Sequence, residues 1–190
     1  MSRCRFGAAV ALLTLAAAAP RFAAAEEAAA EPDAERVARG KYLVDVIGCN
    51  DCHTPWKMGE AGPEPEMDRF LSGHRQDANL PPAPELGEGP WEATMSGSFT
   101  AFSGPWGTSF TRNLTPDDET GLGNWTEQEF IDTLRNGRQR GIGRELLPPM
   151  PWYNFAKATD DDLKAIWAYL QSLPAVSNRV LDPIPPVAAH

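Results

Sequence analysis

Residues 49–53 read Cys-Asn-Asp-Cys-His, and this motif constrains the fold more than any other feature of the sequence. Two cysteines three positions apart, followed directly by a histidine, form the attachment pattern of haem c. The thiols of Cys49 and Cys52 would form thioethers with the two vinyl groups of the macrocycle. His53 would then lie under the iron and supply an axial nitrogen. The sequence therefore predicts one covalently bound haem c.

Two other uses of such a motif agree less well with its surroundings. A thiol exchanger usually places Cys-x-x-Cys at the start of a helix after a strand, whereas a helical pattern precedes the motif here. A zinc site needs four ligands, and Cys49, Cys52 and His53 have no convincing fourth ligand nearby. We interpret the motif as a haem site and keep thiol chemistry as a distant alternative.

A low-spin iron carrier needs a sixth ligand, and Met150 is the residue that we expect to supply it. Met150 stands between Pro149 and Pro151, which restrict the backbone and favour an extended conformation at the methionine. A stiff backbone can hold a thioether against iron. The other candidates are Met58, Met67, Met95, His74 and His190. We expect His74, which follows Ser-Gly, to be a surface loop residue.

The first 25 residues have the pattern of a cleaved signal peptide. Arg3 and Arg5 provide a positive region, an apolar run follows, and small residues at 23–25 suit cleavage before Glu26. The apolar run is too short to cross a bilayer, and no later run approaches that length, so we expect no membrane span in the mature chain. We predict a periplasmic protein.

The charge of the mature chain also excludes some partners. The whole chain has 17 Lys and Arg against 26 Asp and Glu. Cleavage would remove three arginines and leave a formal charge of about −12. Such a charge argues against nucleic acid as a partner and suits a basic docking patch on another protein. Cleavage would also remove Cys4, so that only the two motif cysteines remain.

Three segments have the pattern of principal helices. Asp33 can cap a helix that runs to about Ile47 and has Gly40 in its middle. Thr126, three residues before a glutamate, opens a second helix, which a glycine ends. Thr159, three residues before an aspartate, opens a third helix, which ends before a proline.

The remaining segments define the expected domain organisation. Residues 57–110 are rich in Pro, Gly and aromatic side chains, and we expect an ordered, mostly irregular insertion with a short hairpin within 94–112. This insertion would interrupt a domain that covers residues 33–176. A flexible leader over 26–32 would precede the domain. A Pro-rich tail over 177–190 would follow it and lie on the surface.

Three stretches of the sequence resemble class I cytochromes c. The first runs from Gly-Lys-Tyr-Leu at 40–43 to the haem motif. The second comprises Asn-Leu-Thr-Pro-Asp at 113–117 and Thr-Gly-Leu-Gly-Asn-Trp at 120–125. The third begins with Pro-Met-Pro-Trp at 149–152 and continues through the last helical pattern. The chain is more closely similar to the monohaem cytochrome c domains and subunits of periplasmic dehydrogenases.

This resemblance implies a fold class and a ligand set. The expected fold is all-α and cytochrome c-like, with three principal helices around one covalently bound haem and a long irregular insertion. The axial ligands would be His53 and Met150. The first and last helices would cross near Gly40 on one side and near Ile166, Tyr169 and Leu170 on the other.

An iron with histidine and methionine as axial ligands has no open position for a substrate and can only exchange an electron. The sequence therefore predicts a monohaem electron carrier in the periplasm that is not itself an enzyme. It would act as a soluble carrier or as the electron-transfer subunit of a dehydrogenase or oxidase chain. The redox partners would be a periplasmic dehydrogenase, a terminal oxidase or other cytochromes. The alternative is a catalytic, peroxidase-like haem protein with a displaceable sixth ligand.

Four arginines precede the predicted sixth ligand in an otherwise acidic chain. They are Arg135, Arg138, Arg140 and Arg144. They would neutralise the haem propionates, form a docking patch or lie on a solvated turn. The sequence alone leaves these three interpretations open.

Overall fold

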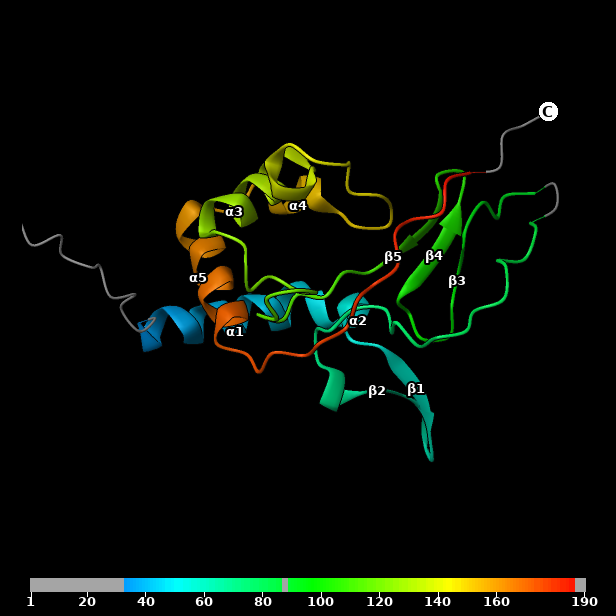
Figure 1. The fold of residues 1–190 in the computed structure, drawn as a ribbon, viewed down its shortest axis with the longest axis horizontal. Coiled ribbons are helices and arrows are strands. Elements are labelled where there is room, and N and C mark those ends of the chain that lie inside the picture. Colours follow the sequence, from blue (N-terminus) through cyan, green and yellow to red (C-terminus); the bar gives the residue numbers. More distant parts are fainter. Residues whose placement is uncertain (1–32, 87–88, 187–190) are drawn as a thin grey trace, which may run out of the picture. The chain divides into compact units, whose positions relative to one another are not determined.

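The computed structural model describes residues 33–86 and 89–186 (Figure 1). The expected signal peptide, the leader and His190 lie outside these residues. The helices are α1 (Ala34–Ile47), α2 (Cys49–His53), α3 (Glu127–Asn136), α4 (Trp152–Phe155) and α5 (Asp160–Gln171), with 3-10 turns η1 (Met67–Arg69) and η2 (Gln139–Gly141). The strands are β1 (Trp56–Gly59), β2 (Gly62–Pro65), β3 (Thr94–Met95), β4 (Ala101–Gly104) and β5 (Gly107–Phe110).

The three principal helices form where the sequence predicts them. The Asp33 side chain caps α1 by accepting a hydrogen bond from the backbone N–H of Glu35. Thr126 and Glu129 form a reciprocal capping box at the start of α3. The Thr159 side chain accepts from the third backbone N–H of α5. These contacts satisfy N–H groups that have no partner within the helix.

Helices α1 and α5 cross at Gly40, as the resemblance predicts. A Cβ atom at Gly40 would collide with the backbone carbonyl of Ala165 and lie 2.8 Å from the Cβ of Tyr169. Figure 1 shows α5 running across α1. An ion pair between Arg39 and Asp162, with 2.9 Å between nitrogen and oxygen, joins the same two helices. The glycine thus allows two helix backbones to approach closely.

The main core cluster of the protein lies among these helices and the loops that connect them. Its most deeply buried members are Val44, Leu71, Leu163 and Leu170. Leu43, Phe130, Ile131, Leu134, Ile166 and Tyr169 are also among its buried members. Apolar side chains from α1, α3 and α5 therefore share one core, as the helical spacing indicated.

The expectation of an all-α fold with an irregular insertion is wrong. Helices account for only about 34% of the structure, and the described residues also form two antiparallel sheets. Strands β1 and β2 form a hairpin, and β3, β4 and β5 form a three-stranded sheet in that order. The β4–β5 hairpin confirms the hairpin predicted within 94–112. Strand pairing satisfies the backbone N–H and C=O groups of a long segment locally.

The tail packs against the three-stranded sheet and the loop that follows η1. Val180 forms a second buried cluster with Ala101 of β4 and Phe110 of β5. Asn178 is fully buried, although we expected the tail to lie on the surface. Ile184 exchanges backbone hydrogen bonds with Thr108 of β5.

Among the described helices, none has the length and apolar character that a membrane span requires.

Candidate haem site

The motif cysteines lie on α2, a helix of five residues that follows α1 after a single glycine. Gly48 has a left-handed backbone, with φ at 76°, and its N–H donates to the carbonyl of Val44. This turn ends α1 and lets α2 begin at Cys49. Residues three apart on a helix are neighbours, so Cys49 and Cys52 share one side of α2. Both are half-buried free thiols.

The thiols do not have the properties of a disulfide exchange site. Burial, with a smaller contribution from the Asp51 carboxylate, raises the pKa of the Cys49 thiol to about 11. The same two causes, burial first, raise the pKa of Cys52. Thiol exchange proceeds through a thiolate, and exchange cysteines have lowered pKa values. The surroundings of Cys49 and Cys52 thus favour protonated thiols, and this finding weakens the thiol alternative.

The ring of His53 is oriented by a backbone carbonyl. Its Nδ1–H donates to the carbonyl oxygen of Arg112, with 2.7 Å between nitrogen and oxygen. Burial lowers the pKa of His53, and the bond to Arg112 opposes this shift only in part. A neutral imidazole that donates through Nδ1 keeps the lone pair of Nε2 for a metal. The geometry of His53 therefore fits an axial haem ligand.

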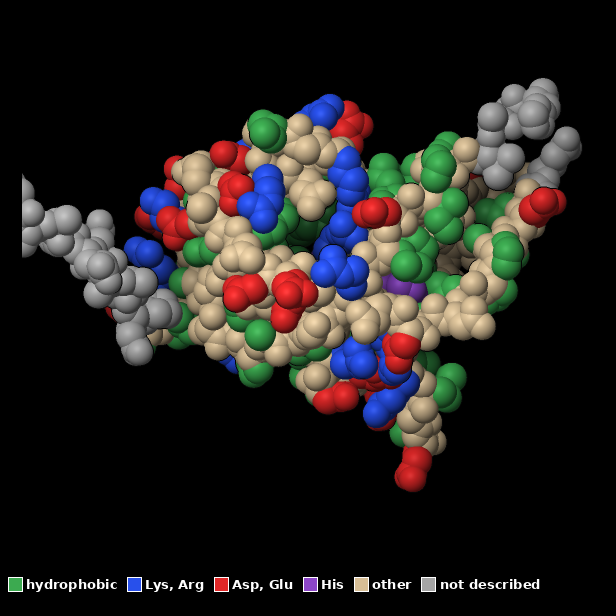
Figure 2. All heavy atoms as spheres, in the orientation of Figure 1, with side chains coloured by type: hydrophobic (Ala, Val, Ile, Leu, Met, Phe, Trp, Pro, Cys, Tyr) green, Lys and Arg blue, Asp and Glu red, His purple; other side chains and the backbone are tan. Residues whose placement is uncertain are grey.

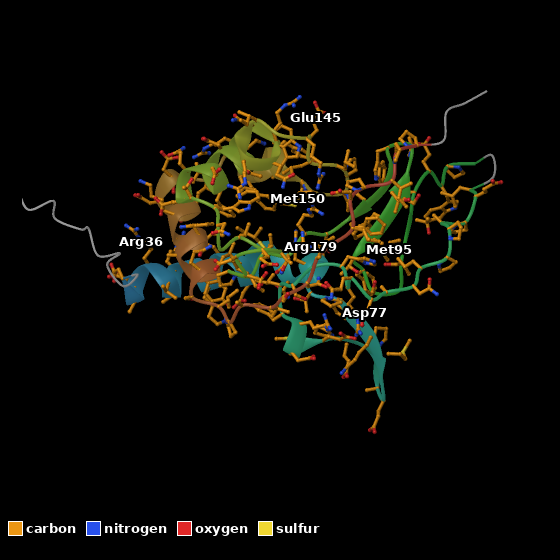
Figure 3. All side chains as sticks on the ribbon, in the orientation of Figure 1. Arg36, Asp77, Met95, Glu145, Met150 and Arg179 are labelled. Carbon is orange, nitrogen blue, oxygen red and sulfur yellow. The ribbon has the colours of Figure 1, made fainter. Side chains whose placement is uncertain are left out.

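Met150 and Cys49 of the haem motif pack against the same apolar core. The side chain of Met150 is half-buried and packs against the main core cluster, and Cys49 packs against that cluster as well. Met150 also lines a pocket of about 220 Å³ beside α4. The other lining residues are Leu146, Pro148, Pro149, Trp152 and Tyr153. Figure 3 shows Met150 beside α4.

The other predicted candidates for the sixth ligand have different surroundings. Met58, Met67 and Met95 are exposed by 77%, 62% and 54%, and none belongs to the main core cluster. His74 is buried, contrary to the expectation of a surface loop residue. Its Nδ1 is 2.9 Å from the hydroxyl of Thr100, and its ring packs against Phe110. Of the described candidates, Met150 alone packs against the main core cluster.

A zinc site at the motif finds no support in the described part of the chain. Among these residues, no group of three or more His, Cys, Asp and Glu side chains is arranged to hold a metal ion. Cys49, Cys52 and His53 are therefore not gathered around one point. In a haem site this is expected, because the cysteines bind the edge of the macrocycle and the histidine binds the iron.

The arginine cluster divides into two kinds of residue. Arg135, Arg138 and Arg140 form ion pairs with Asp160, Glu145 and Glu129, respectively. Arg144 has no carboxylate within ion-pair distance among the described residues. Three of the four arginines are thus neutralised by carboxylates of the local structure. Arg144 forms no such ion pair with the described residues.

The hydrogen bond between His53 and the carbonyl of Arg112 could not be predicted from the sequence. Every residue has a carbonyl oxygen, and Arg112 is 59 residues from His53 in the chain. The nearest signal is its position directly before the Asn-Leu-Thr-Pro-Asp stretch at 113–117, which carries part of the resemblance. That stretch locates a family feature but does not say which carbonyl faces the histidine.

Several known proteins are similar to the chain. No family model matches the chain. The chain is 29% identical to the fructose dehydrogenase cytochrome subunit of Gluconobacter japonicus, over 72% of the chain and 21% of that subunit. It is 42% identical to the cytochrome c subunit of the quinone alcohol dehydrogenase of Gluconobacter oxydans, over 34% of the chain and 13% of that subunit.

A further relative extends the match along the chain. The corresponding alcohol dehydrogenase subunit of Komagataeibacter europaeus is 28% identical over 83% of the chain and 26% of the subunit. The chain thus spans between about an eighth and a quarter of the length of these three relatives. These matches confirm the resemblance predicted from the sequence: the chain is similar to the cytochrome c subunits of dehydrogenases.

Proposed function

We propose that the chain is a monohaem c-type cytochrome that transfers single electrons in the periplasm as part of a dehydrogenase chain. The observation that carries this proposal is the pairing of two free cysteines on α2 with an adjacent histidine whose ring a backbone carbonyl orients. Cys49 and Cys52 would form the two thioethers. His53 and Met150 would be the axial ligands.

The surroundings of these residues suit electron transfer better than catalysis. A bound haem supplies a one-electron couple between Fe(III) and Fe(II). His53 is held in one orientation by its bond to Arg112, and a ligand in a fixed orientation needs little rearrangement when the electron moves. The thioether of Met150 is a soft ligand that favours Fe(II), and an apolar core disfavours the additional charge of Fe(III).

The proposed partners follow from the relatives and from the charge of the chain. The relatives are named as subunits of fructose and alcohol dehydrogenases, so the proposed electron donor is a periplasmic dehydrogenase. The proposed acceptor is another cytochrome or a terminal oxidase. The whole chain has a formal charge of −9, which suits docking to a basic surface.

Haem attachment is the first test. The pyridine haemochrome spectrum of the purified protein should have the band positions of a haem with two thioether links, at one haem per chain. Cys49→Ala with Cys52→Ala should abolish haem staining on a denaturing gel. A matched control, Asn50→Ala with Asp51→Ala, changes the two residues between the cysteines and should keep the stain. Haem retained by the cysteine double variant would contradict the proposal.

Electron transfer without catalysis is the second test. The oxidised holoprotein, without a partner, is incubated with a panel of alcohols, aldehydes, sugars and sugar acids. We expect no catalytic reduction of the haem, and we expect reduced protein not to bind carbon monoxide because Met150 would occupy the sixth position. Substrate oxidation in proportion to haem reduction would make the protein an enzyme. Rapid binding of carbon monoxide would favour a displaceable sixth ligand.

A further inference from the structure

Arg144 carries a positive charge in a partly buried position, and no carboxylate of the described residues forms an ion pair with it. Within the described part of the chain its buried Nε has no hydrogen-bond acceptor, and one Nη donates to the carbonyl of Glu145 at 3.3 Å. A buried donor without a partner costs about 1–3 kcal/mol, and more when it is charged. This arrangement indicates that an acceptor outside the described protein atoms belongs at Arg144.

A second arginine lies close enough to Arg144 to affect its charge. Burial first, and then the positive charge of Arg112, lower the pKa of Arg144, and Asp182 opposes them. Arg112 itself donates to the carbonyls of Val180 and Leu181. Asp182 is 3.5 Å from Arg112 but is 87% exposed, so solvent weakens its effect. Arg112 is thus paired with one exposed carboxylate, and Arg144 is affected by that carboxylate only at longer range.

Both arginines belong to segments that hold the predicted axial ligands. The carbonyl of Arg112 orients the ring of His53. Arg144 lies two residues before Leu146, which lines the pocket beside Met150. Figure 2 shows a column of Lys and Arg side chains along one side of a hollow in which apolar side chains are visible. A ligand with an apolar body and anionic groups at one edge matches such a surface.

We propose that Arg144, assisted by Arg112, binds the propionate groups of the haem. This inference rests on the proposed function. Of the three interpretations of the arginine cluster, it assigns propionate binding to Arg144. The propionates are the anionic groups of haem c, and a guanidinium binds a carboxylate through two parallel hydrogen bonds. Arg144 is therefore a positioning residue for the haem, and the paired arginines at 135, 138 and 140 stabilise the loop around it.

The experiment compares Arg144→Gln with Arg138→Gln in the holoprotein. Both variants remove one positive charge from the same loop, but Arg138 has its own carboxylate, Glu145, at 2.6 Å. Without Arg144, the propionate charge would act on the iron less screened and would favour Fe(III). We expect the Fe(III)/Fe(II) ratio against a fixed reference couple to rise about tenfold in Arg144→Gln. This change corresponds to a fall of about 59 mV in the reduction potential of the haem. Arg138→Gln should change this ratio less than about twofold.

A spectroscopic measurement separates propionate binding from a structural effect. The propionate bending band in the resonance Raman spectrum should move in Arg144→Gln and stay in place in Arg138→Gln. Arg144→Lys keeps the positive charge but loses the two parallel N–H donors of the guanidinium group. The Raman band should therefore move, while the Fe(III)/Fe(II) ratio should change less than about twofold. This variant tests the proposal even if Arg144→Gln does not mature.

Two outcomes would overturn the inference. Equal shifts of potential in Arg144→Gln and Arg138→Gln, with an unmoved Raman band, would show that Arg144 does not touch the propionates. An unmoved band together with slower electron exchange with a partner would assign Arg144 to docking. In either case the haem would still be attached. Absence of covalent haem from the parent protein would instead contradict the proposed function itself.

Discussion

The Nδ1–H of His53 donates to the carbonyl oxygen of Arg112 at 2.7 Å, although 59 residues separate the two in the chain. The backbone carbonyl of His53 accepts a second hydrogen bond, from the N–H of Gly73, also at 2.7 Å. Two loops therefore hold the predicted axial histidine, one through its ring and one through its backbone. Both contacts use backbone atoms, so they depend on how closely the loops approach each other.

Gly73→Ala should disturb this approach. Gly73 has φ at 78°, and a Cβ there would lie 2.5 Å from backbone atoms of Thr111 and Arg112. We expect a loss of about 1–3 kcal/mol in the free energy of unfolding, because the residue is strained and the neighbouring segment must move. We also expect a lower yield of haem-containing protein. Urea unfolding and the ratio of haem to protein absorbance measure the two effects.

The control for this prediction is Gly97→Ala. Gly97 is exposed, and a Cβ there would have no heavy atom of the described residues within 4 Å. Its substitution should change the free energy of unfolding by less than about 0.5 kcal/mol. If Gly73→Ala unfolded at the same urea concentration as Gly97→Ala and kept its haem, the loop contact would not be needed to hold His53.

Met150→Ala tests the sixth ligand directly. The ferric holoprotein should have the weak far-red absorption of an iron–thioether bond, and Met150→Ala should remove it. The matched control is Met95→Ala, because Met95 is 54% exposed on β3 and should not touch the iron. Loss of the band in Met95→Ala, with the band kept in Met150→Ala, would show that the proline-flanked methionine is not the ligand.

The helices could be predicted because their signals are local. The side chains of Asp33, Thr126 and Thr159 each bond an N–H two or three residues further on, so the sequence pattern contains the whole interaction. Gly40 is an intermediate case. Its place in the middle of an apolar helix indicates that something approaches closely, but only the resemblance identified the last helix as the partner.

The β1–β2 hairpin and the contact of His53 with the Arg112 carbonyl could not be predicted, because neither has a clear signal in the local sequence. Residues 56–65 lack the alternation of apolar and polar side chains that marks a strand, and β1 and β2 both have an exposed centre. Their pairing depends on backbone hydrogen bonds and on a turn at Gly62, where φ is 126°. Likewise, the surroundings of His74 come from Thr100, from Phe110 of β5 and from Asn178 of the tail, which lie far along the chain.

Gly40→Ala should destabilise the protein more than an exposed substitution of the same kind. The new Cβ would collide with the Ala165 carbonyl and force α1 and α5 apart. In an exposed helix, Gly→Ala stabilises by about 1 kcal/mol, so the sign of the effect distinguishes the two situations. We expect a net loss of about 1–3 kcal/mol in urea unfolding. A gain in stability would show that the two helices do not cross at Gly40.

The burial of His74 predicts a dependence of stability on pH. Burial lowers the pKa of His74, whereas an unfolded histidine titrates at its ordinary value of 6.5. Between the lowered folded value and 6.5, the unfolded chain binds more protons than the folded protein. The contribution of neutral His74 to stability is therefore fully present above pH 6.5. It is lost as the pH falls through 6.5 toward the folded value.

His74→Gln should flatten the decline of stability between pH 7 and pH 5, as measured by urea unfolding of the holoprotein at several pH values. A polar amide keeps a donor and an acceptor in the buried position but takes up no proton in this range. The matched control is Thr100→Val, which removes the hydroxyl 2.9 Å from His74 Nδ1 and leaves the imidazole in place. This control should lower stability by about 1 kcal/mol at every pH and retain the decline. If His74→Gln retained the same decline of stability with falling pH, the imidazole of His74 would not be its cause. Another group would then take up the proton.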